Sequence, residues 1–388
     1  MKTIRVLIFA LLLFATQRAH AQWSWKASLE AGLSQVDNIF KSPGSLLLDG
    51  QMLDADLLYA NDLSVPLSLK MDATLRTGTH RIDLDYRSVL NRYSKLNYLN
   101  GGYHYLRLGD SWQVAKAWRL SARVTGRVSR RVGTNILGDE LARVYAYASL
   151  RAEAGLRWAP SRRHTFEAGY QWNRYNYDET AGLQSLDQSN LINDLGWTYR
   201  SRKRKGKYRK VSMDLTHRIK TYHAYLSRSA SGLQNPGSPL NQLTYYDAAL
   251  GFEWGLTRWL AWDIDLEGRV RNDAFEDYYS YIAAGINSGF DIEPIRNVLI
   301  RAEAGWRSVN FKVREALLPG GSDAPRLVYN YINWHFEASC KITRSITVTA
   351  FAESNDRVSN ATLESSRIRR SYQTFQNGLT LTYTLGSR

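Results

Sequence analysis

The stretch that decides the fold is residues 143–158, RVYAYASLRAEAGLRW. From Val144 to Trp158 every even position is apolar, while the odd positions carry arginine, tyrosine, serine, glutamate or glycine. Side chains alternate between the two faces of a strand, whereas a helix would mix both sets around its circumference. Strict alternation over this length therefore predicts a long β-strand with one apolar and one polar face.

The same alternation recurs along the chain, at 23–33, 120–129, 246–256, 260–271, 298–307 and 379–385. Short polar connections stand at Ala159–Arg163, Thr257–Arg258, Glu293–Asn297 and Thr343–Arg344. Longer ones stand at Asn38–Gln51, Asp178–Asn190, Ser227–Gln242, Glu315–Pro325 and Asn360–Arg369. Short turns on one rim and long loops on the other are typical of an up-and-down barrel in a membrane. We expect about 16 strands, with 14 or 12 as alternatives; the strand interrupted by Pro66 and the short run at Tyr103–Gly109 are the hardest to place.

A secreted β-sandwich is the alternative, because its strands also alternate. Two features favour the membrane barrel. The alternating runs are longer than the five or six residues, roughly, of a typical sandwich strand. Trp158, Trp254 and Trp262 also lie at strand ends beside short turns, where an aromatic girdle at a membrane interface belongs. The fold class predicted is thus all-β, a single transmembrane antiparallel barrel.

The N-terminus predicts export of the chain. Lys2 and Arg5 precede an apolar stretch, Val6–Ala15, and Ala19-His20-Ala21 forms a small-x-small cleavage site. We therefore expect a signal peptide at 1–21 and a barrel at 22–388, with an uncleaved N-terminal anchor as the alternative. The chain has one cysteine, Cys340, which excludes a disulfide framework, and no Cys/His spacing indicates a metal site. We expect neither a metal nor a cofactor.

These features together resemble the bacterial outer-membrane β-barrel proteins of the porin-like kind. The resemblance covers residues 22–388 through the alternating strands and the loop rhythm, and it implies the outer membrane of a Gram-negative bacterium, its lipids and its barrel-assembly machinery as surroundings. One departure is the C-terminus. Many such proteins end in Phe or Trp, which the assembly machinery reads, whereas this chain ends Leu385-Gly386-Ser387-Arg388.

If the apolar face contacts lipid, the polar face lines the lumen. The acids expected there are Asp83, Asp85, Glu153, Glu167, Asp247, Glu253, Asp263, Asp265, Glu267, Glu303 and Glu337. The bases expected there are Arg87, Arg123, Arg127, Arg143, Arg151, Arg157, Arg269, Arg271, Arg301, Arg307 and Lys341. So many charges would cost too much to desolvate in a dry core, which predicts a water-filled lumen. Opposing rows of acid and base would create a transverse field; cross-strand ion pairs that merely stiffen the wall are the alternative.

The chain carries 51 Lys and Arg against 36 Asp and Glu, a net charge of +15. A basic run, Arg200–Lys210, is expected at a periplasmic turn, either as a solvated turn or as a site for an acidic periplasmic partner or for anionic headgroups. Nucleic acid is not an expected partner of an exported membrane protein.

The leading functional hypothesis is a porin-like channel for passive passage of small hydrophilic solutes. The second is a barrel that serves a polysaccharide or surface-protein export or assembly system. The third is an outer-membrane hydrolase, for which a histidine paired with a serine or an acid would be needed. The mature chain has six histidines, His80, His104, His164, His217, His223 and His335, but no nucleophile elbow or metal-ligand spacing. We therefore expect a protein that is not an enzyme.

Overall fold

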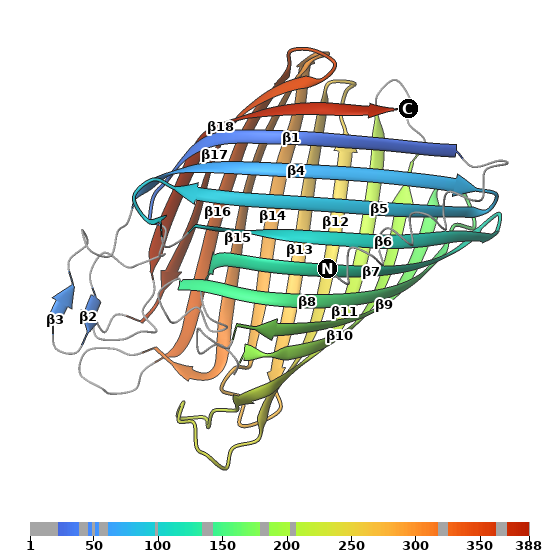
Figure 1. Ribbon diagram of the computed structural model, residues 1–388. Coiled ribbons are helices and arrows are strands. Elements are labelled where there is room, and N and C mark those ends of the chain that lie inside the picture. The colour runs from blue at the N-terminus through green and yellow to red at the C-terminus, as the bar shows by residue number, and fades with distance from the viewer. Residues whose placement is uncertain are drawn as a thin grey trace, which may run out of the picture.

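In the computed structural model the chain forms a closed antiparallel barrel of 16 strands (Figure 1). The structure describes residues 22–38, 46–48, 51–53, 61–97, 100–133, 143–178, 186–201, 207–316, 325–361 and 371–387. The expected signal peptide, residues 1–21, lies outside this range. Among the described residues no helix is long and apolar enough to span a membrane.

The barrel strands follow one another in chain order, and β1 closes the ring by pairing with both β4 and β18. The strands are β1 (Gln22–Val36), β4 (Asp62–Thr77), β5 (His80–Tyr93), β6 (Gly101–Ala115), β7 (Trp118–Gly133), β8 (Arg143–Trp158), β9 (His164–Tyr177), β10 (Gln188–Arg200), β11 (Tyr208–Leu226), β12 (Leu240–Gly255), β13 (Leu260–Asp273), β14 (Tyr281–Ile295), β15 (Val298–Glu315), β16 (Arg326–Lys341), β17 (Ile346–Ser359) and β18 (Tyr372–Ser387). Along the chain, a small hairpin of β2 (Leu46–Leu48) and β3 (Gln51–Leu53) follows β1 and precedes β4. It lies apart from the barrel wall (Figure 1).

The count of 16 confirms the expected fold class. The two difficult regions are both full strands: β4 contains Pro66, and the run near Tyr103 belongs to β6. Pro66 has no N–H to donate, and the paired register between β1 and β4 is interrupted between Ala31 and Ser34 at this point. The ladder continues on both sides, so one proline does not end the strand.

The two rims differ as the connections predict. We call the rim with turns such as 78–79, 116–117 and 296–297 the short-turn end, and the other rim the long-loop end. The turn at 78–79 is compact because Gly78 adopts a φ of 57°, a conformation that glycine tolerates without steric cost.

Large apolar side chains lie on the outer face, and no other described part of the chain packs over them. Val128 is 63% exposed, Leu195 is 60% exposed and Leu379 is 58% exposed. Exposing so large an apolar surface to water would be energetically unfavourable, whereas lipid chains would bury it. The tight packing of the molecule lies elsewhere, on the inner face near the long-loop end.

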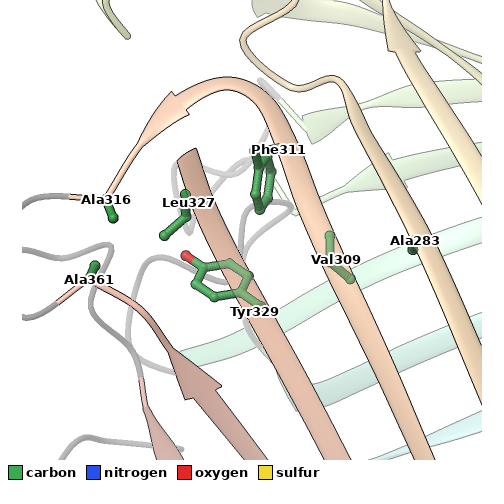
Figure 2. Close-up of a cluster of buried hydrophobic side chains, with 7 residues drawn as sticks. All are labelled: Ala283, Val309, Phe311, Ala316, Leu327, Tyr329 and Ala361. Carbon is green, nitrogen blue, oxygen red and sulfur yellow. The ribbon is translucent and has the colours of Figure 1, made fainter. Parts of the chain in front are cut away.

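One buried cluster there is formed by β14, β15 and β16 together with two residues of the adjoining loops (Figure 2). It consists of Ala283, Val309, Phe311, Ala316, Leu327, Tyr329 and Ala361. The five strand members point inward, so the inner face is not polar along its whole length. This apolar packing holds the ends of three strands together where the barrel opens.

Candidate functional site in the barrel interior

Hydrogen-bond register shows which side chains share the inner face. Paired residues of neighbouring strands point to the same side, so the row that contains Arg123 and Glu153 can be followed from strand to strand.

 In this way Arg123 of β7 faces Glu153 of β8, and Glu153 faces Gln171 of β9. The inner face carries most of the charge of the barrel wall.

One hollow along this inner face has a volume of about 920 Å³ and is lined by β4 to β11. Its cations are Lys70, Arg81, Arg107, Arg119, Arg123, Arg151 and Arg157. Its carboxylates are Asp72, Asp83, Asp85, Glu153, Glu167, Asp194 and Asp214. Cations and carboxylates are thus balanced in number around one space, and together they make a strongly polar surface.

Ion pairs across neighbouring strands organise this surface. The Nε of Arg107 donates to Asp85 at 2.6 Å, and the Nε of Arg157 lies 3.4 Å from a carboxylate oxygen of Glu167. Glu153 is shared by Arg151 and Arg123, whose Nη1 lies 3.7 Å from Glu153 Oε2. The Glu153 side chain is 16% exposed, whereas those of Arg123 and Arg151 are about half exposed, at 51% and 48%. The arginines therefore project into the lumen while the carboxylate lies against the wall.

A second hollow, of about 340 Å³, lies against β11 to β15 and carries more carboxylates than cations. Its carboxylates are Glu253, Asp263, Asp265 and Asp291, and its cations are Lys210 and Arg301. Arg301 binds Asp291 through two hydrogen bonds, of 2.7 and 3.0 Å. Among the described residues Asp263 and Asp265 have no ion-pair partner within 4.0 Å, so this wall keeps uncompensated negative charge.

The two walls face each other. In the ring of 16 strands, β5, β6 and β7 stand opposite β13, β14 and β15. Arg81 and Arg119 of the first group and Asp263 of the second all lie within a few residues of the short-turn end. The half of the lumen nearer the short turns thus has an arginine-rich wall opposite a carboxylate-rich wall.

Toward the long-loop end, arginine stacks on tyrosine instead of pairing with acid. The Arg127 guanidinium lies 4.4 Å from the ring centre of Tyr103, and that of Arg271 lies 4.1 Å from the ring of Tyr281. Arg307 makes the same contact with Tyr331, at 4.8 Å. Such cation–π contacts hold an extended guanidinium in place without neutralising its charge.

A loop covers part of the inner wall at this end. Residues 274–280 connect β13 to β14, and the Tyr279 carbonyl accepts a hydrogen bond from Nε of Arg271, at 2.5 Å. Tyr279 is fully buried beside Tyr222 and Tyr245, and its hydroxyl lies 3.0 Å from that of Tyr225. Burial, together with the neighbouring Tyr225, raises the pKa of Tyr279 and keeps its hydroxyl neutral. The loop thus packs against inward residues of β11 and β12 near the long-loop end.

The residues expected in the lumen are placed as follows. Arg123, Arg151, Glu153, Arg157, Asp83, Asp85 and Glu167 line the larger hollow, and Glu253, Asp263, Asp265 and Arg301 line the smaller one. Asp247, Glu267, Arg269 and Arg307 line a third space of about 200 Å³. Arg87, Arg127, Arg271, Glu303, Glu337 and Lys341 share the inner register rows of their strands without lining these spaces. The side chain of Arg143 lies outside the described residues.

Several inner charges were not anticipated. Lys70, Asp72 and Arg81 belong to β4 and β5, Arg107 to β6, and Asp194 and Asp214 to β10 and β11. Their signal was present in the sequence, since each occupies the polar phase of its own strand. If the two-residue alternation is continued past Pro66 and through the run near Tyr103, it places Lys70, Asp72, Arg81 and Arg107 on the inner face.

The aromatic residues expected at an interface lie on the outer face at the short-turn end, in two separate clusters. Trp158 stacks between Trp118, at 5.5 Å, and Phe166, at 5.2 Å between ring centres. Trp254 stacks on Trp262 at 5.0 Å. Part of the expected partner site at Arg200–Lys210, residues 202–206, lies outside the described residues.

All six histidines of the barrel have polar partners: His335 lies on the inner face, where its Nδ1 is 3.3 Å from Glu353 and its Nε2 is 3.8 Å from Glu337. Three pairs on the outer face are the ones that bear on a hydrolase. The Nδ1 of His80 lies 3.0 Å from Asp110, and the Nε2 of His223 lies 2.9 Å from the Ser189 hydroxyl. The Nδ1 of His104 lies 3.2 Å from the Tyr86 hydroxyl. Within the part of the chain that the structure describes, no acid is hydrogen-bonded to His223, and no three His, Cys, Asp or Glu side chains are grouped to hold a metal ion.

No model of a known protein family matches this chain, and no curated protein matches it in sequence. Solved structures do resemble it. OccAB3 from Acinetobacter baumannii has a TM-score of 0.51 at 10% identity, over 94% of this chain and 99% of that one. The fold is that of a porin-like outer-membrane β-barrel.

Two further structures are similar at lower scores. OpdQ from Pseudomonas aeruginosa has a TM-score of 0.49 at 10% identity, over 94% of this chain and 98% of that one. A bacterial polysaccharide outer membrane secretin has a TM-score of 0.44 at 10% identity, over 92% of this chain and 98% of that one. At these identities the likeness describes the barrel and not what passes through it.

Proposed function

We propose that the protein is a channel for passive passage of small hydrophilic solutes across the outer membrane of a Gram-negative bacterium. The observation that carries the proposal is the contrast between the two faces of one closed wall. The outer face is apolar and uncovered, whereas the inner face surrounds charged hollows. Lipid outside and water inside satisfy both faces at once.

The mechanism follows from the arrangement of the inner charges. A solute entering at the long-loop end first meets tyrosines and the arginines stacked on them, such as Arg127 and Arg271. It then passes between the arginine-rich wall of β5 to β8 and the carboxylate-rich wall of β12 to β15. The field between these walls orders water and aligns polar solutes, while apolar solutes lose hydration there.

We infer that the protein is a channel and not an enzyme. Neither outer pair is a complete triad among the described residues, because His223 contacts Ser189 but no hydrogen-bonded acid, and His80 contacts Asp110 but no hydrogen-bonded serine. Their positions fit roles in the outer wall, where a polar group gains a hydrogen-bond partner.

The test is single-channel conductance of the purified, refolded protein in a planar bilayer. We expect stable current steps whose size rises with salt concentration, because a water-filled lumen conducts ions. A protein that is folded by circular dichroism and heat-modifiability but passes no current would refute the channel. That outcome would instead favour a plugged barrel that serves an export or assembly system.

A further inference from the structure

Four carboxylates of the inner wall lie directly across from a glycine of the neighbouring strand. These strands, β10 to β14, form the green to orange part of the ring in Figure 1. Among the described residues, none of the four acids lies within ion-pair distance of a cation. We call the four glycines the seat glycines. The pairs are Asp214–Gly196, Asp265–Gly251, Glu267–Gly285 and Asp263–Gly289.

Each carboxylate occupies the space that a Cβ atom on the opposite glycine would need. The nearest carboxylate oxygen would stand 2.9 Å from such an atom on Gly196, 2.6 Å on Gly251, 2.8 Å on Gly285 and 3.0 Å on Gly289. Directly paired residues of an antiparallel sheet bring their Cβ atoms to about 4.5–5.5 Å, so two full side chains crowd each other and stand up from the wall. A glycine on one side lets the carboxylate lie along the wall instead.

The arginine-rich wall of β5 to β8 holds its acids in another way. Asp85 accepts a hydrogen bond from Arg107 at 2.6 Å, and Glu153 is shared by two arginines. Those carboxylates are neutralised and held in place by their ion pairs. Asp214 and Asp265 are exposed to the lumen and keep their full charge. The seat glycines therefore hold a carboxylate close to the wall without neutralising it.

We propose that the seat glycines determine the specificity of the pore: they keep four uncompensated carboxylates against one wall, so that the lumen favours small hydrated cations there without becoming narrower. The inference rests on the proposed channel and deepens it, because it assigns charge preference to residues that carry no charge. Asp263, Asp265 and Glu267 are successive inward residues of β13. A cation can therefore pass from one carboxylate to the next along that strand.

Alanine at a seat should displace the carboxylate and leave the fold intact. The atoms that a new methyl group would meet most closely at Gly196 and at Gly251 are the ends of flexible side chains, which can turn to another rotamer. A carboxylate that stands about 3 Å closer to a passing ion in about 0.1 M salt raises the ratio of potassium to chloride permeability about twofold. The displaced side chain also narrows the lumen.

The test compares Gly196→Ala and Gly251→Ala with Gly268→Ala, each in the full chain in planar bilayers. Gly268 is the matched control because it lies on the outer face of β13, where a Cβ atom would meet nothing within 4 Å. The reversal potential in a potassium chloride gradient gives the permeability ratio, and conductance in about 1 M salt, where charge is largely screened, reports the width. We expect a higher ratio and a lower conductance in both seat variants, and no change in Gly268→Ala.

A double-mutant cycle separates the effect of the carboxylate from an effect on the backbone. Asp214→Ala empties the seat, so adding Gly196→Ala to it should leave the permeability ratio unchanged. An equal effect of Gly196→Ala with and without the Asp214 carboxylate would overturn the proposal. Seat variants that conduct and select as the unaltered chain does would overturn it as well.

A further readout does not depend on current. In a Cys340→Ala background, Asp214→Cys places a thiol opposite Gly196. Adding Gly196→Ala should turn that thiol toward the lumen and speed its reaction with a charged thiosulfonate reagent in detergent. Faster reaction in a protein that passes no current would overturn the channel while the seats stand. An unchanged rate beside a normal current would overturn the seats and leave the channel.

Discussion

The shared carboxylate of Glu153 distinguishes a lumen that selects ions from a wall that is merely stiffened by ion pairs. Replacing it, Glu153→Gln, leaves Arg123 and Arg151 in the larger hollow without their common partner and adds one unit of positive charge there. The amide keeps nearly the same volume, so the shape of the wall is preserved. We expect the pore to become more selective for anions.

The size of the change follows from Coulomb's law. One unit charge about 6 Å from a passing ion contributes about 0.7 kcal/mol at the dielectric constant of water. A Debye length of about 10 Å in 0.1 M salt reduces this to about 0.4 kcal/mol. The local concentration of chloride then rises about twofold and that of potassium falls about twofold, so the permeability ratio changes about fourfold.

The assay is the reversal potential across a bilayer with a tenfold potassium chloride gradient. Arg123→Gln should move the potential in the opposite direction. Glu293→Gln is the control, since Glu293 is an exposed residue near the short turn at 296–297 and does not line the charged hollows. An unchanged potential in both hollow variants, with a loss of about 1 kcal/mol or less in unfolding free energy, would refute the selective lumen and leave ion pairs that only stiffen the wall.

Other consequences concern the rims. The Asp62 carboxylate accepts hydrogen bonds from the amides of Lys95, at 2.9 Å, and Leu96, at 2.8 Å. Asp62→Ala should speed hydrogen exchange at these amides roughly tenfold or more, because each bond to a charged acceptor contributes about 1.5–3 kcal/mol; unchanged exchange would show that the loop does not depend on Asp62. Trp158→Ala removes two ring contacts, with Trp118 and Phe166, and should lower the free energy of unfolding in lipid vesicles by about 1–3 kcal/mol. Trp158→Phe should recover part of that loss, and equal stability of all three proteins in urea titrations would contradict a girdle. Tyr278→Ala with Tyr279→Ala removes the aromatic anchors of the loop 274–280 and should raise single-channel conductance; the same conductance as the unaltered chain would mean that this loop does not narrow the pore.

The local sequence pattern predicted most strands of the barrel wall. The alternation at 144–158 identified β8 almost to the residue, because a strand repeats every two residues and every slip would turn the apolar set inward. The same argument located the odd positions of β13, from Asp263 to Arg271, on the inner register rows. It was weaker in β4, where Pro66 removes an N–H from the ladder but does not end the strand.

Which inner side chains pair with which on neighbouring strands escaped prediction. The sequence presents Arg123, Arg151 and Glu153 as three inner charges, but only register shows that one carboxylate serves two arginines. In the sequence, Val309, Phe311 and Leu327 are apolar residues at positions where the alternation predicts polar, inward side chains. In the folded chain they pack with Tyr329 and with residues of the adjoining loops, where apolar burial replaces hydration (Figure 2).

The sequence by itself determined the strands, the two faces and the rhythm of turns and loops, because each depends on residues close together in the chain. Only the tertiary structure decided that the ring closes at 16 strands through β1 and β18, and which walls then face each other. Those relations depend on distances across the barrel, between residues up to several hundred positions apart in sequence. The predicted charge selection belongs to that second class, since it requires side chains from several strands in one place.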